Sequence, residues 1–150
     1  MPAQLIDPQE LLSRRILAID DEEANVLLLR NLLQREGYTD VHCLTDSREA
    51  LSTYIDLEPD LVLLDLMMPE IDGFQLLEAF SRHDAADEFR PVLVLTADTT
   101  IQAKRRALAL GAKDFVAKPF DVIEVGLRIA NLLETRLLYE RLRGAERNPA

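Results

Sequence analysis

The chain has 150 residues, of which 48% are hydrophobic, enough for one domain with a sizeable core. Its 27 acidic and 17 basic residues give a formal net charge of −10, so direct binding to nucleic acid or to an anionic membrane surface is not expected. The first residues lack the pattern of a signal peptide, and no apolar run approaches the roughly twenty residues that a membrane-spanning helix needs. We therefore expect a cytoplasmic protein that has neither nucleic acid nor membrane as a partner.

Short aliphatic segments alternate with longer segments of helical periodicity along the chain. Residues 1–13 contain two prolines and are expected to form a leader with one short helical turn. The strand candidates are residues 15–20, 41–44, 61–65, 92–96 and 114–117. Helices are expected at about 22–36, 47–57, 72–83, 99–110 and 121–144. The pattern is a strand followed by a helix, repeated five times.

The strand candidates are continuous aliphatic runs, which are typical of parallel strands covered by helices on both faces. The sequence therefore predicts an α/β fold, a doubly wound five-stranded parallel sheet of the flavodoxin-like type with an extended C-terminal helix. Gly37 and Gly111 lie where helices are expected to end in a left-handed residue. Asp46 and Ser47 offer side-chain oxygens that could cap the start of a helix.

Polar side chains follow four of the predicted strands. Asp20 and Asp21 end the first strand, Asp65 ends the third, Thr96 ends the fourth, and Lys118 follows the fifth. The carboxyl ends of parallel strands meet at one edge of a sheet, where such folds bind ligands. Three carboxylates crowded together repel one another unless a cation neutralises them. Because the donors are oxygens without His or Cys, the expected cation is Mg²⁺.

A carboxylate beside Mg²⁺ can act as a nucleophile toward a phosphoryl group and form an aspartyl phosphate. Asp65 is the best candidate because it lies in the middle of the sheet, whereas Asp20 and Asp21 are placed as a metal-binding pair. Lys118 and Thr96 would supply a cation and a hydroxyl for the phosphoryl oxygens. Any of these residues alone could be a helix cap or a solvated loop residue. Their joint placement at four strand ends favours the catalytic interpretation.

With these residues assembled, the chain resembles the receiver domain of bacterial two-component response regulators. The resemblance is carried, in order and spacing, by IDDEE (19–23), LVLLDLMMPEIDGF (61–74), VLVLTAD (92–98) and GAKDFVAKPF (111–120). It implies three parts, which are a leader at 1–13, a receiver domain at 14–135, and an extension of the last helix at 136–150.

The resemblance implies that Asp65 takes a phosphoryl group from a histidine kinase or a phosphotransfer protein. Such a module modifies itself and slowly loses its phosphate, so it is not expected to be an enzyme that turns over a free substrate. The resemblance also implies that Asp21, Asp65 and the backbone carbonyl of Met67 hold Mg²⁺, with Asp20 acting partly through water.

A conformational switch is implied as well. In the family, a phosphoryl group draws the hydroxyl at the position of Thr96 inward, and the aromatic ring at the position of Phe115 follows. The face formed by the fourth main helix, the fifth strand and the fifth helix then changes. The Lys118–Pro119 peptide bond is expected to be cis.

Helical composition continues to about Arg143, beyond what a receiver domain needs. Leu137, Leu138 and Leu142 lie there among charged residues, with no obvious partner inside a five-stranded fold. The extension could be a coiled-coil seam of a homodimer, or a helix leading to an output domain missing from this chain. A frayed, solvated tail is the third interpretation.

Two other functions compete with the phosphorylated receiver. A small phosphatase like the haloacid dehalogenases also uses an aspartate, Mg²⁺, a hydroxyl and a lysine, but it needs an Asp-x-Asp pair on the first strand. Asp65-Leu66-Met67 lacks the second acid. A receiver-like adaptor that takes no phosphate and acts through its C-terminal helix is the other alternative, and the five intact site residues argue against it.

Overall fold

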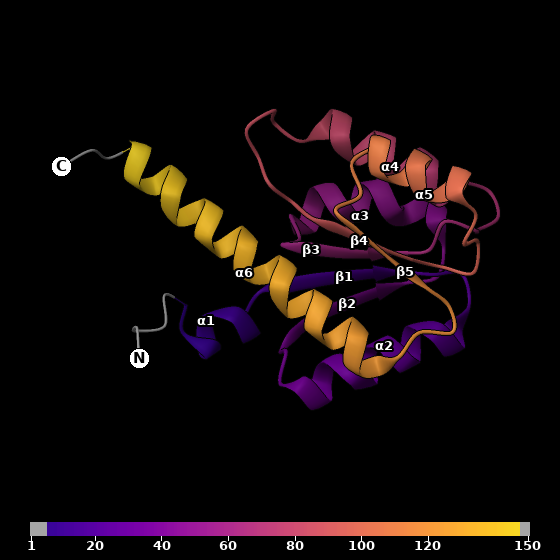
Figure 1. Ribbon diagram of the computed structural model, residues 1–150, viewed down its shortest axis with the longest axis horizontal. Coiled ribbons are helices and arrows are strands. Elements are labelled where there is room, and N and C mark those ends of the chain that lie inside the picture. Colours follow the sequence, from indigo (N-terminus) through magenta and orange to yellow (C-terminus); the bar gives the residue numbers. More distant parts are fainter. Residues whose placement is uncertain (1–5, 148–150) are drawn as a thin grey trace.

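The computed structural model describes residues 6–147, in which a parallel sheet of five strands lies between two layers of helices (Figure 1). The strands are β1 (Arg15–Ile19), β2 (Asp40–Leu44), β3 (Leu61–Leu64), β4 (Val92–Thr96) and β5 (Asp114–Ala117). Their order across the sheet is β2-β1-β3-β4-β5, and each neighbouring pair is parallel. This confirms the predicted fold class.

The helices lie close to their predicted positions. They are α1 (Pro8–Leu12), α2 (Glu23–Glu36), α3 (Ala50–Leu57), α4 (Gly73–His83), α5 (Ile101–Ala109) and α6 (Val122–Arg147). The helix expected at 47–57 begins instead as a 3₁₀ turn, η1 (Ser47–Glu49), in which the Glu49 N–H donates to the Asp46 carbonyl three residues earlier. The Asp46 carboxylate caps this turn by accepting the backbone N–H of Arg48. Gly37 and Gly111 have φ of 100° and 113°, the left-handed conformation predicted for both.

The central strands β1, β3 and β4 are buried on both faces because successive side chains point to opposite layers, whereas the edge strands β2 and β5 are only partly buried. On one face, residues such as Leu17, Val62 and Val94 pack with α3, α4 and α5. On the other face, residues such as Ile16 and Leu63 pack with α2 and α6. Each fully buried side chain of this size contributes about 1.5–3 kcal/mol, which makes the sheet a rigid support for the loops at its ends.

The last helix, α6, runs past the end of the sheet, and α1 lies beside it (Figure 1). The expectation that this extension has no partner within the fold was wrong, since Leu137 is 1% exposed. Neighbouring residues contact α1, the residues after it and the loop before β4: Arg141 pairs with Glu10 on α1, Arg14 pairs with Glu140 at 3.1 Å, and the rings of Phe89 and Tyr139 lie 5.8 Å apart. These partners could not be predicted from the sequence pattern, because they come from segments expected to be a leader and a loop.

Parts of the predicted leader (1–5) and of the predicted extension (148–150) lie outside the described residues. Between residues 6 and 147, no helix combines the length and the apolar character that crossing a bilayer requires.

Candidate functional site

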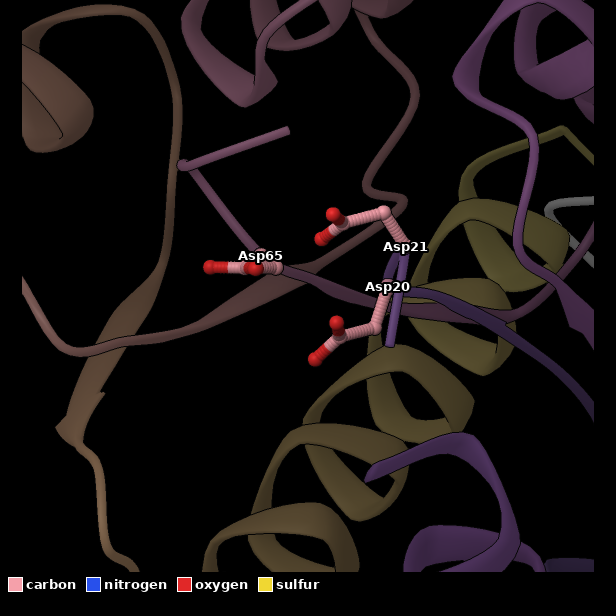
Figure 2. A group of neighbouring side chains, drawn as sticks. All are labelled: Asp20, Asp21 and Asp65. Carbon is pink, nitrogen blue, oxygen red and sulfur yellow. The ribbon is translucent and has the colours of Figure 1, made fainter. Parts of the chain in front are cut away.

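Three aspartates meet at the carboxyl end of the sheet. Asp20 and Asp21 directly follow β1, and Asp65 directly follows β3, its hydrogen-bonded neighbour in the sheet. One carboxylate oxygen from each residue lies within 4.8 Å of the others, and Figure 2 shows the three side chains around one space. Asp20 and Asp65 are buried, with 3% and 6% exposure, whereas Asp21 is exposed. The predicted carboxylate cluster is therefore present.

Lys118 supplies the cation of this cluster. Its ammonium donates to Asp20 Oδ2 at 2.6 Å and lies 3.4 Å from Asp65 Oδ2. The residue follows β5, and its backbone N–H donates to the Thr96 carbonyl at 2.9 Å, which fixes the loop beside β4. The Lys118–Pro119 bond is cis, as predicted. One ammonium faces three carboxylates, so the cluster keeps an excess of negative charge.

The surroundings raise the pKa of both Asp65 and Lys118. Burial raises the pKa of Asp65, the charge of Asp20 adds to this effect, and the attraction of Lys118 offsets only part of it. Burial alone would lower the pKa of Lys118, but the hydrogen bond to Asp20 and the nearby carboxylates outweigh it and raise that pKa. The ammonium thus stays charged, while the Asp65 carboxylate binds a proton more readily than an ordinary aspartate, an effect that a further bound cation would oppose.

The cluster opens into a cavity of about 560 Å³. Asp21, Asp65, Met67 and Lys118 contribute to its wall, and the other lining residues are Glu22, Asn25, Leu28, Ala97, Pro119 and Phe120. The backbone N–H of Met67 donates to Asp65 Oδ1 at 3.2 Å, which orients the carboxylate, and the Met67 side chain is 59% exposed at the mouth. The cavity has room for a phosphoryl group next to Asp65.

Sequence reasoning did not single out several lining residues. Asn25 and Leu28 come from the first turns of α2, which begins only two residues after Asp21. Their spacing of three residues places both on one helix face. That spacing, counted from the acidic pair, was the signal that could have found them.

Thr96 and Phe115 lie on the neighbouring strands β4 and β5 and differ in burial. Thr96, at the end of β4, is fully buried, and its hydroxyl accepts the backbone N–H of Asp98 at 3.3 Å. Phe115 pairs with Val94 in the sheet and is half-buried against the core beneath α4 and α5. Their coupled movement stays a prediction.

The family model for the response regulator receiver domain matches residues 16–130. The chain belongs to this family. The receiver domain is 34% identical over 129 residues to the regulatory protein AtoC of Escherichia coli, covering 86% of this chain and 27% of that protein. It is 40% identical over 119 residues to the DNA-binding dual master transcriptional regulator RpaA of Synechocystis, covering 79% and 48%.

A solved chain is similar throughout the fold. It comes from the CheX–CheY–BeF3–Mg²⁺ complex of Borrelia burgdorferi, with a TM-score of 0.73 and 28% identity over 79% of this chain and 88% of that one. The two curated relatives are much longer than the matched region, so this chain spans only a quarter to a half of their length. The family match itself leaves out α1 and about the last two thirds of α6, residues 131–147.

Proposed function

We propose that this receiver domain is a phosphoacceptor that takes a phosphoryl group onto Asp65 from a histidine kinase or a phosphotransfer protein. An Asp65 carboxylate oxygen would form the new O–P bond while the P–N bond of phosphohistidine breaks, and the leaving imidazole nitrogen takes up a proton. The observation that carries the proposal is the buried Asp65 carboxylate at the wall of a cavity, 3.4 Å from the Lys118 ammonium.

The donor set fits a divalent ion. Three carboxylates against one ammonium leave negative charge for a cation, and oxygen donors alone suit Mg²⁺. Asp21, Asp65 and the Met67 carbonyl would hold the ion, with Asp20 acting partly through water. When bound, Mg²⁺ supplies positive charge for the transferred phosphoryl oxygens. The CheX–CheY complex, which contains Mg²⁺ and beryllofluoride, supports this assignment.

Lys118 and Thr96 would contact the phosphoryl group, and Phe115 would respond to its presence. The Lys118 ammonium would bind one phosphoryl oxygen, and the Thr96 hydroxyl, which accepts the Asp98 N–H, would donate its own O–H to another. Phe115 would then follow Thr96 and change the face formed by α5, β5 and α6. The chemistry is on the domain itself, so we propose a signalling module and not an enzyme with a free substrate.

The partners follow from the same assignment. We propose a cytoplasmic protein whose partner is a kinase or a phosphotransfer protein, and whose acidic charge disfavours direct contact with nucleic acid. The name of RpaA attaches DNA binding to a protein about twice as long, so that activity is not carried over.

The extension of α6 keeps two proposed roles, a homodimer seam or a connection to an output domain. Leu138 and Leu142 are 41% and 60% exposed, so a seam could use them. Molecular mass in solution, with and without beryllofluoride, tests the seam. A monomer in both states would rule it out.

Incubation with acetyl phosphate or phosphoramidate and Mg²⁺, followed by intact-mass measurement, tests the function. One phosphoryl group per chain is expected, and Asp65→Asn should abolish it. Asp56→Asn, which removes an exposed carboxylate on α3, is the matched control and should leave it unchanged. Many turnovers of a phosphomonoester would favour the phosphatase, and no incorporation into the unmodified protein would favour the adaptor.

A further inference from the structure

The loop between β3 and α4, residues 66–72, connects the phosphoacceptor to the rest of the domain. It starts directly after Asp65 and carries Met67, whose N–H holds the Asp65 carboxylate. At its far end, Gly73 lies so close to the start of the loop that a Cβ there would be 2.4 Å from the Asp65 carbonyl oxygen. The two ends of the loop are therefore tied together.

The middle of this loop is held by a residue from another connection. Ser47, at the start of η1, is 4% exposed. Its hydroxyl donates to the Pro69 carbonyl at 2.9 Å and accepts the Ile71 N–H at 3.2 Å. One buried hydroxyl thus satisfies two backbone groups on either side of Glu70.

The two hydrogen bonds of Ser47 flank Glu70, which has an unfavourable backbone conformation. Its φ is 68°, a left-handed conformation that side chains other than glycine adopt at a cost. The surrounding contacts must stabilise such a residue, and the two hydrogen bonds of Ser47 flank it directly. Without the hydroxyl, the Pro69 carbonyl and the Ile71 N–H would keep only their hydrogen bond to each other, at 2.9 Å, and the turn could relax.

We propose that Ser47 is a positioning residue for the metal and phosphoryl site, a role that rests on the proposed function. It fixes the Pro69–Ile71 turn and, through it, the backbone of Met67 two residues earlier. Mg²⁺ requires near-octahedral geometry, so a small displacement of a backbone ligand weakens its binding. Ser47 contacts neither the ion nor the phosphoryl group.

The test compares Ser47→Ala with Ser52→Ala. Ser52 also donates to a backbone carbonyl, that of Glu49 at 3.1 Å, on the same segment. By calorimetry on the protein without its phosphoryl group, Ser47→Ala should raise the Kd for Mg²⁺ about three- to tenfold, and Ser52→Ala should leave it unchanged. The Ile71 amide should exchange faster in metal-free Ser47→Ala only. Phosphorylation by acetyl phosphate should slow at subsaturating Mg²⁺ and recover at saturation.

A hydroxyl-retaining variant separates positioning from folding. Ser47→Thr should keep an Mg²⁺ Kd near that of the unmodified protein, and Ser47→Cys, a weaker hydrogen-bonding group, should lie between Ser and Ala. This ranking can be measured even if Ser47→Ala fails to fold. An unchanged Kd in Ser47→Ala, or in Ser47→Cys where Ala is not folded, would overturn the positioning role alone. Failure of the unmodified protein to bind Mg²⁺ or accept a phosphoryl group would instead overturn the proposed function.

Discussion

Buried aspartates lie at both ends of the sheet, but the two ends differ in how much positive charge lies close to them. At the amino end, Asp60 precedes β3 and accepts the Arg15 N–H at 2.9 Å and Arg136 Nε at 2.7 Å, with Arg14 at 3.6 Å. At the carboxyl end, Asp65 follows the same strand and shares one ammonium with Asp20. Asp60 alone has two arginine side chains of the chain nearby, whereas Asp65 and Asp20 share a single lysine. Unmatched charge, more than burial, thus distinguishes the candidate functional site from a structural ion pair.

The ion pairs at the amino end of the sheet also connect segments that lie far apart in the sequence. Arg14 bridges from the end of α1 to Glu140, and Arg141 pairs with Glu10 on α1. Arg136 links α6 to Asp60. The first two pairs join parts of the chain that lie outside the family match, and the pairs of Asp60 with Arg14 and Arg136 join those parts to the matched receiver fold.

The largest expected effect comes from removing the Asp60 carboxylate at the amino end of the sheet. Asp60→Ala would leave Arg136, which is 11% exposed, without its buried partner, and should lower the free energy of unfolding by about 3 kcal/mol. Urea unfolding followed by circular dichroism measures this loss. Asp56→Ala, at an exposed position, should change stability by less than about 0.5 kcal/mol. Equal stabilities of the two variants would contradict the structural role of Asp60.

Adding Mg²⁺ should stabilise the folded protein by binding to the aspartates at the carboxyl end of the sheet. At 100 times its Kd, the ion should raise the free energy of unfolding by about 2.7 kcal/mol, because it binds the folded state only. Thermal unfolding with and without Mg²⁺ measures the gain. Asp21→Ala should remove most of it, and Asp60→Asn should keep it. A gain that survives Asp21→Ala would place the ion elsewhere.

A smaller effect is expected where the ion pairs are more exposed. Arg14→Ala removes the contacts to Glu140 and Asp60 and should cost about 1 kcal/mol, since partly solvated pairs contribute little. Hydrogen exchange should quicken in α6 after residue 136 and stay unchanged in β1 to β4. Arg82→Ala, which removes an exposed pair within α4, is the control. Unchanged exchange in α6 would show that apolar contacts alone hold the extension.

The smallest expected effect is on the pH dependence of stability. Burial would raise the pKa of Asp40, but hydrogen bonds from Arg15 and His42 outweigh it and lower that pKa. A carboxylate whose pKa is lowered by folding stabilises the protein above its unfolded pKa of about 3.9, and this contribution fades as the pH falls through the folded value. Asp40→Asn should therefore be less stable than the unmodified protein at neutral pH, and the difference should shrink below about pH 4. A difference that stays constant to lower pH would contradict this account.

Much of the fold could be predicted because its signals are local. Aliphatic runs fixed the strands, and polar residues at their ends placed Asp20, Asp21, Asp65 and Lys118 together. The contact between Arg14 and Glu140 could not be predicted, since it joins residues 126 positions apart and depends on where α6 passes. The role of Ser47 was missed for a related reason. Its hydroxyl matched a local capping pattern, but Asp46 is the cap, and Ser47 serves the distant loop after Asp65.

The length of α6 has a mechanical consequence. The helix begins two residues after Phe120, which lines the cavity, and its 26 residues end beyond Tyr139, which packs on Phe89 at the opposite end of the sheet. At 1.5 Å per residue it is a lever arm about 39 Å long, so a tilt of about 3° at its first turn displaces its far end by about 2 Å. A rearrangement around Lys118 that tilted the helix would therefore move its far part most, and the contacts of Arg136 with Asp60 and of Tyr139 with Phe89 would oppose such a tilt.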